Sequence, residues 1–113
     1  MLGEDHPDTL TSGNNLAYAY RVAGDVGRAI PLYEKVLADR LRVQGGDHPD
    51  TLRSRNNLAG ACRAAGDLGR AIPLYEQTLA DCERVLSKDH PLVELVRDNL
   101  GAALAERDDG STG

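Results

Sequence analysis

Tryptophan and phenylalanine are absent from this sequence, and four tyrosines are its only large aromatic residues. The core must therefore be built from leucine, alanine, valine and isoleucine, which suits closely packed helices. Long hydrophobic runs are also missing, and the N-terminus lacks the basic start and apolar middle of a signal peptide. A membrane span and secretion are therefore not expected, and we predict a cytoplasmic protein.

Cysteine and positive charge are scarce as well. The two cysteines, Cys62 and Cys82, lack the framework of paired positions found in disulfide-rich proteins, so we interpret them as reduced thiols. The formal net charge is −5, whereas a general nucleic-acid binder carries a basic surface that neutralises phosphates. Nucleic-acid binding is therefore not expected.

What the sequence does contain is an internal repeat. A shift of 42 residues aligns Asp5–Val43 with Asp47–Val85, and 29 of these 39 aligned positions are identical without insertion or deletion. Such a fixed period is typical of repeat arrays, in which each unit buries its apolar face against its neighbours. We predict a single repeat domain over 1–113, with unit one at 5–46, unit two at 47–88, a terminal half-repeat helix at 89–106 and a disordered tail at 107–113.

Each unit predicts two antiparallel helices. In unit one the first helix begins at Pro7, because the first helical turn does not need the N–H that proline lacks. Gly24 is suited to a left-handed C-cap and Asp25 to an N-cap, so this pair predicts a tight turn into the second helix. Pro31 lies inside the amphipathic pattern of the second helix and predicts a bend. The same signals recur in unit two at Pro49, Gly66, Asp67 and Pro73.

The two ends of the chain differ from the repeat. A degenerate start at Asp89-His90-Pro91 predicts one closing helix that covers unit two. The residues after 106 are polar and rich in glycine, which predicts the disordered tail. At the other end, Leu2-Gly3-Glu4 aligns with Gln44-Gly45-Gly46, the segment that closes unit one. We therefore expect five helices in an excerpt from a longer array.

The repeated residues resemble those of the tetratricopeptide repeat. The shared pattern is Leu-Ala-x-x-Tyr in the first helix, glycine at the turn, and alanine and tyrosine in the second helix. The period departs from the common unit of about 34 residues. With the phrases Asp-His-Pro-Asp-Thr-Leu and Ala-Ile-Pro-Leu-Tyr-Glu, the longer unit is similar to the repeats of kinesin light chains and of related bacterial arrays. The pattern is carried by Leu16, Ala17, Tyr20, Gly24, Ala29 and Tyr33, and by Leu58, Ala59, Gly66, Ala71 and Tyr75.

This resemblance implies an all-α, right-handed solenoid of antiparallel helix pairs whose first helices line a concave groove. It further implies a protein-interaction scaffold, not an enzyme, that binds an extended peptide and uses no cofactor. Asparagine offers the donor and acceptor that a peptide backbone requires, and arginine beside it favours an acidic segment. The candidate groove residues are Asn14, Asn15, Tyr18, Arg21, Arg53, Asn56, Asn57, Arg63 and Asn99. By position, Thr11, Val22, Gly60, Ala64, Asp98 and Ala102 would also line the groove.

The asparagines and arginines also have structural interpretations. Asn15, Asn57 and Asn99 equally fit hydrogen bonds to carbonyl groups of a neighbouring helix across each repeat junction, because buried polar groups need partners. Arg53 and Arg63 fit ordinary solvated residues of a helix surface. Both interpretations stay open at the level of the sequence.

No catalytic or metal-binding arrangement stands out from the repeat. The three histidines, His6, His48 and His90, occur once per unit, too far apart to share one metal ion, and each fits a cap at a helix start. Two further functional hypotheses remain. One is self-association of the units through the open N-terminal end, by end-to-end or swapped stacking. The other, implied by bacterial relatives, is a sensor segment of a larger signalling ATPase.

Overall fold

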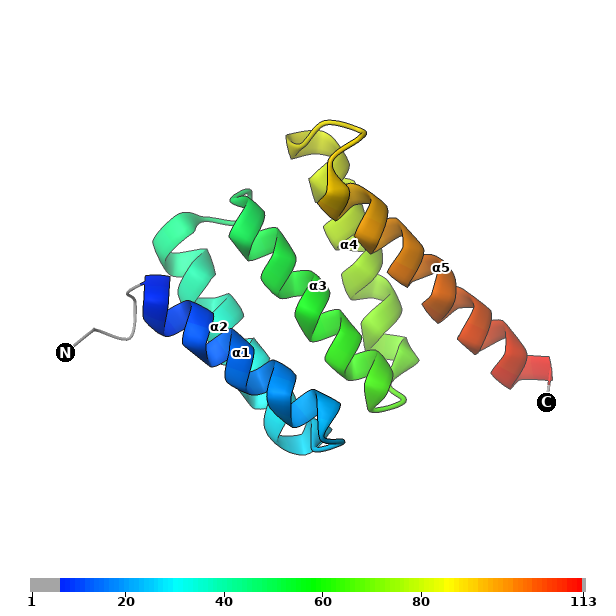
Figure 1. Cartoon of the computed structure of the whole chain (residues 1–113). Helices are drawn as coiled ribbons and strands as arrows, with labels where there is room; N and C mark the ends of the chain where they lie inside the picture. The colour runs from blue at the N-terminus through cyan, green and yellow to red at the C-terminus, as the bar shows by residue number, and fades with distance from the viewer. Residues whose placement is uncertain (1–6, 113) are drawn as a thin grey trace.

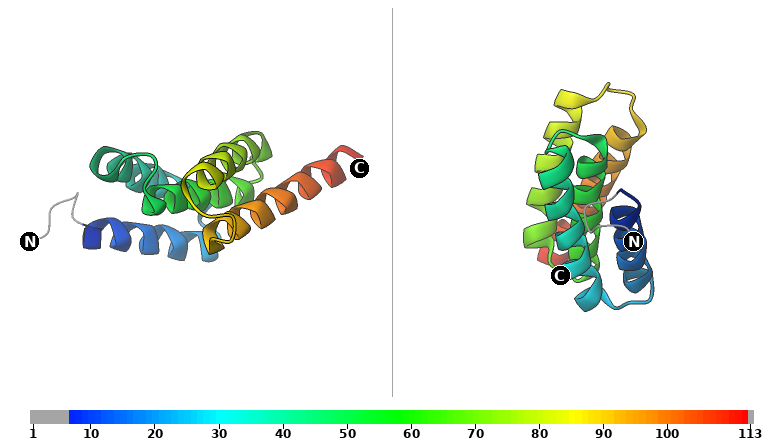
Figure 2. Two further views of the ribbon diagram at one scale, coloured as in Figure 1. Left: turned by 90° about the horizontal axis from the view of Figure 1, so that it is seen from above. Right: turned by 90° about the vertical axis from the view of Figure 1, so that its left-hand side faces the viewer.

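A computed structural model describes the backbone of residues 7–112 and the side chains of residues 10–109. It contains α1 (Pro7–Val22), α2 (Val26–Gln44), α3 (Pro49–Ala64), α4 (Leu68–Val85) and α5 (Pro91–Thr112), with no strand in the described residues. In Figure 1, α1, α3 and α5 form the front layer and α2 and α4 the back layer, and the side view of Figure 2 separates the same layers. The predicted all-α solenoid of helix pairs with a closing fifth helix is confirmed.

The turns form where the sequence predicts them. Asp25 and Asp67 cap α2 and α4, and the carboxylate of each accepts a hydrogen bond of 3.2 Å from the backbone N–H three residues later. Gly24 and Gly66 before them have φ angles of 87° and 82°, a conformation that glycine adopts without the steric penalty of a Cβ. The Gly-Asp pair therefore builds the same turn in both units.

Histidine side chains cap the first helices. Nδ1 of His48 accepts a hydrogen bond from the N–H of Asp50 at 3.0 Å, and Nδ1 of His90 accepts one from Leu92 at 3.1 Å. The predicted cap role is thus confirmed for these two histidines, whereas His6 lies outside the described residues.

Two sequence predictions need correction. The shared repeat pattern predicts the same environment for Leu16 and Leu58, but Leu16 is 49% exposed, whereas Leu58 is 3% exposed. The reason is that α3 packs between α2 and α4, while α1 packs mainly against α2. The predicted tail beginning at residue 107 is also wrong, because α5 continues to Thr112. Residues 102–107 are all good helix formers, and the first glycine after them is Gly110.

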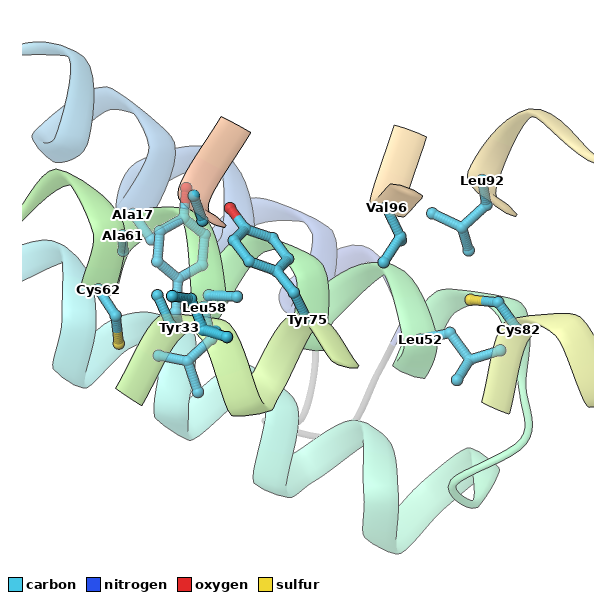
Figure 3. Packing of buried hydrophobic residues seen from close by; sticks show 14 of the residues in the cluster. Ala17, Tyr33, Leu52, Leu58, Ala61, Cys62, Tyr75, Cys82, Leu92 and Val96 are labelled. Atoms are coloured by element: carbon cyan, nitrogen blue, oxygen red, sulfur yellow. The ribbon is translucent and has the colours of Figure 1, made fainter. Parts of the chain in front are cut away.

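The core runs between the two layers and joins the closing helix to unit two. In Figure 3, Leu92 and Val96 of α5 point toward Leu52 of α3 and Cys82 of α4, and all four are at most 2% exposed. Cys62 and Cys82 are both free, as predicted, and burial raises the pKa of each thiol. They pack as small apolar side chains.

An ion pair specific to unit two also ties the layers together. Nη1 of Arg55 on α3 lies 2.6 Å from Oδ2 of Asp81 on α4, and both side chains are less than one-fifth exposed. Burial alone would raise the pKa of Asp81, but hydrogen bonds from Arg55, Gln77 and Arg84, together with the charge of Arg55, outweigh this effect and lower the pKa below 3.8. In unit one the counterpart Asp39 is instead paired within its own helix.

We expect Asp81→Asn to reduce the free energy of unfolding at pH 7 by about 1–3 kcal/mol, as for a charge-assisted hydrogen bond. Because the pKa of Asp81 is lowered in the folded state, its contribution is present above the unfolded value near 3.8 and is lost as the pH falls below it. Urea unfolding at pH 7 and at pH 3 measures the difference. The matched control is Asp39→Asn, at 15% exposure of the carboxylate, and an equal cost for both variants would contradict the prediction.

Candidate functional site

The first helices of the repeat enclose a mainly polar hollow of about 380 Å³, which we call the central hollow. Its floor is one face of α3, because side chains spaced three or four residues apart share one side of a helix. Helices α1 and α5 provide its two sides, and α4 contributes one residue from beneath. The lining residues are Arg21, Asn56, Asn57, Gly60, Arg63, Ala64, Tyr75, Asn99 and Glu106.

Asparagine side chains connect the three first helices along the central hollow. Nδ2 of Asn57 donates a hydrogen bond to Oδ1 of Asn14 at 2.9 Å, and Nδ2 of Asn99 donates one to Oδ1 of Asn56 at 3.1 Å. The second bond is the first one shifted by a repeat of 42 residues. The asparagines thus bond across the junctions, to side-chain amides rather than to carbonyl groups of the backbone. Each amide retains further donors and acceptors beyond this bond.

Arg21 enters the central hollow because Gly60 has no side chain. The guanidinium of Arg21 lies over the ring of Tyr18, 5.6 Å from its centroid. Its Nη1 is 2.7 Å from the position that a Cβ on Gly60 would occupy, which is closer than a real Cβ permits. In unit one the position equivalent to Gly60 is Tyr18 itself. This difference between the units supplies both the room for the guanidinium and the ring on which it stacks.

A buried tyrosine lies beneath each arginine of the hollow. Burial raises the pKa of Tyr33 and of Tyr75, so both hydroxyls stay protonated at neutral pH; Arg21 offsets part of this shift at Tyr33, and Arg63 at Tyr75. The two tyrosines, and likewise the two arginines, are one repeat apart. Figure 3 shows both hydroxyls pointing to the same side of the core. The repeat therefore places a tyrosine–arginine pair twice along the site.

Arg63 also faces a carboxylate from the closing helix. Its Nε lies 2.7 Å from Oε1 of Glu106, and the two side chains are 31% and 45% exposed. Burial lowers the pKa of Arg63, but the hydrogen bonds and charge interactions with Glu106 and Tyr75 together outweigh this effect and raise the pKa above its usual value. The guanidinium is therefore charged and held at the edge of the hollow.

The structure brings most of the predicted site residues together. Arg21, Asn56, Asn57, Arg63 and Asn99 line the central hollow. Asn14 adjoins it through the bond to Asn57, and Tyr18 through the contact with Arg21.

Two predicted residues lie outside the hollow. Asn15 is an exposed residue of α1. Arg53 is paired through Nη1 with Oδ1 of Asp50 at 3.2 Å, one turn nearer the start of α3.

Two lining residues, Tyr75 and Glu106, were not among the predicted groove residues. Tyr75 is buried, but it lies one repeat from Tyr33, as Arg63 does from Arg21, and this spacing could have indicated a paired role. Glu106 was placed at the last position of the closing helix, and no repeat signal marks it, because its counterparts are Ala64 and Val22.

The described residues contain no group of three or more histidine, cysteine, aspartate or glutamate side chains placed to hold a metal ion. None of the five helices within residues 7–112 is long and apolar enough to cross a membrane.

Comparison with known proteins agrees with this architecture. The tetratricopeptide repeat family model matches residues 8–84. Two crystal structures of nearly identical TPR-like repeats from a putative kinesin light chain of Podosopora anserina, one carrying a single substitution, match with TM-scores of 0.79 and 0.81. Each is 32% identical and covers 96% of this chain but 51% of the other, so the chain spans about half their length. The search of curated proteins found no match.

Proposed function

Because the chain belongs to the tetratricopeptide repeat family, we propose that its central hollow binds an extended, acidic segment of a protein partner. Tetratricopeptide repeats generally mediate protein–protein interaction. The observation that carries the proposal is the convergence of Arg21 and Arg63 on one polar hollow in a protein whose net charge is −5. Two guanidiniums in such a site favour carboxylates, since charge-assisted hydrogen bonds are the strong ones.

The asparagines fit the backbone of the same segment. An extended peptide presents one donor and one acceptor per residue, and most of these groups are not satisfied within the peptide itself. Asn56, Asn57 and Asn99 retain amide groups that can meet them, and the bonds across the repeat junctions already fix all three side chains to their neighbours. This prior ordering lowers the entropy lost on binding.

A fluorescein-labelled hexaglutamate peptide tests the proposal, with hexaglutamine as the uncharged control. We expect fluorescence anisotropy to detect binding of hexaglutamate at low salt, weaker binding as salt is added, and little binding of hexaglutamine. Equal affinity for the two peptides, or no binding of either, would contradict an acid-binding hollow.

Gly60→Ala separates binding from stability. An added Cβ would force the guanidinium of Arg21 to shift from its place in the hollow, so we expect the affinity for hexaglutamate to fall several-fold. The protein itself should become more stable by up to about 1 kcal/mol, because alanine is the better helix former. Anisotropy and urea unfolding measure the two effects.

The matched control is Gly101→Ala on α5, where an added Cβ meets nothing within 4 Å. It should give a similar gain in stability with unchanged affinity. Unchanged affinity in the Gly60 variant would show that Arg21 does not serve the site.

Self-association is a second candidate, favoured by a different surface. A mainly apolar hollow lies between α1 and α2, and Leu16 and Leu32 contribute to its lining. Leu16 is 49% exposed, although α3 buries the same repeat position at Leu58. Light scattering over a concentration series tests this candidate: a monomer at every concentration would rule it out, and dissociation of an oligomer by Leu16→Asp would support it.

A further inference from the structure

An acidic residue lines the central hollow, and its carboxylate already contacts one of the two arginines there. Glu106 is the only acid among the described residues that line it, and its carboxylate contacts Nε of Arg63 at 2.7 Å. We propose that Glu106 is a built-in competitor, which holds the position that an acidic side chain of the partner takes on binding. This inference rests on the proposed function and adds a mode of regulation to it.

The competing carboxylate belongs to the closing helix alone. One repeat earlier, the position of Glu106 is taken by Ala64 and that of Arg63 by Arg21. Arg21 therefore has no carboxylate at the repeat position from which Glu106 reaches Arg63. It rests instead on the ring of Tyr18. Binding at Arg63 therefore requires displacement of an internal acid, whereas binding at Arg21 does not.

The exposure of the pair shows that the competitor is displaceable. Both side chains are about one-third to one-half exposed. In ion pairs that are this exposed, the paired state is only a few times more populated than the separated state. A site that must first open binds with its affinity reduced by the open fraction. An incoming segment with several carboxylates can therefore displace Glu106. Its first contact requires the Glu106–Arg63 pair to separate, and salt and neighbouring charges change the free energy of that separation.

The position of Glu106 on α5 links this competition to the end of the helix. Helix α5 continues past Glu106 to Thr112, so the carboxylate is held over the hollow by a helical segment rather than by a loop. Anything that unwinds or moves this last part of α5 would withdraw the carboxylate and expose Arg63. The competitor is thus coupled to the order of the C-terminal turns.

Glu106→Gln tests the inference with the hexaglutamate probe. Removal of the competing charge should tighten binding about two- to sixfold, the factor set by a pair populated a few-fold. The same change at Glu94, an exposed residue of α5 outside the hollow, alters the net charge equally and should leave the affinity within about twofold, as expected for a distant surface charge. Unchanged or weaker binding by the Glu106 variant would overturn the inference.

A double substitution shows where the competition acts. In an Arg63→Gln background, Glu106→Gln should no longer change the affinity, because the two side chains compete at one position. If Arg63→Gln weakens hexaglutamate binding but Glu106→Gln has no effect alone, the proposed function stands and the competitor fails. If neither variant nor the wild type binds hexaglutamate, both fall together.

Discussion

Reversing the charge of Arg63 is expected to weaken hexaglutamate binding at least tenfold. The substitution Arg63→Glu removes one of the two guanidiniums of the central hollow and places a second carboxylate beside Glu106. Loss of a hydrogen bond to a charged group costs about 1.5–3 kcal/mol, which corresponds to a factor of ten or more in affinity. The added repulsion acts in the same direction.

Arg97→Glu is the matched control for this change. Arg97 lies on α5, outside the central hollow, in an exposed pair with Glu83 at 3.5 Å. Its reversal alters the net charge of the protein by the same amount. Fluorescence anisotropy at constant salt should therefore show a several-fold effect at most for Arg97→Glu. Equal losses in both variants would mean that the peptide responds to overall charge and not to the hollow.

The second large effect is on stability, and the residue at the same position of the other repeat unit serves as its control. Leu58 is 3% exposed within the core cluster, whereas Leu16, at the same repeat position, is 49% exposed. We expect Leu58→Ala to lower the free energy of unfolding by about 2–5 kcal/mol, because it removes buried methyl groups and leaves a cavity. Leu16→Ala should change it by about 0.5 kcal/mol or less, as an exposed substitution does.

Urea unfolding followed by circular dichroism measures both leucine variants. Because small domains are stable by only about 5–15 kcal/mol, the loss at Leu58 should move the midpoint visibly or unfold the protein. Similar costs at the two positions would show that Leu16 is buried in solution, for example by another copy of the chain. The pair thus bears on self-association as well as on the core.

Local signals in the sequence predicted the helices well. These signals act on residues close by in the chain, so a single sequence contains the necessary information. They are proline at the helix starts, Gly24-Asp25 and Gly66-Asp67 at the turns, and the histidine caps. The repeat then supplied the stacking order, since each unit must bury its apolar face on the next. Family resemblance, rather than composition or spacing, indicated which face carries the site.

The features that the sequence did not predict depend on neighbours. The exposure of Leu16 follows from the packing of α1 mainly on α2, which its own residue type does not reveal. Glu106 enters the hollow because the packing of α5 brings its carboxylate to 2.7 Å from Nε of Arg63 on α3, a contact that no local signal marks. Bonding of the asparagines to carbonyl groups across the junctions was one of two open interpretations, and the register of 43 residues between partners makes these carbonyl groups those of other asparagine side chains.

An NMR titration with hexaglutamate tests the central claim most directly. If the central hollow is the binding site, the Nε–H signals of Arg21 and Arg63 and the side-chain amide signals of Asn57 and Asn99 should shift together and saturate with one affinity. The signals of Arg97, outside the hollow, should stay in place. Shifts confined to the apolar hollow between α1 and α2, or spread evenly over all arginines, would contradict the account.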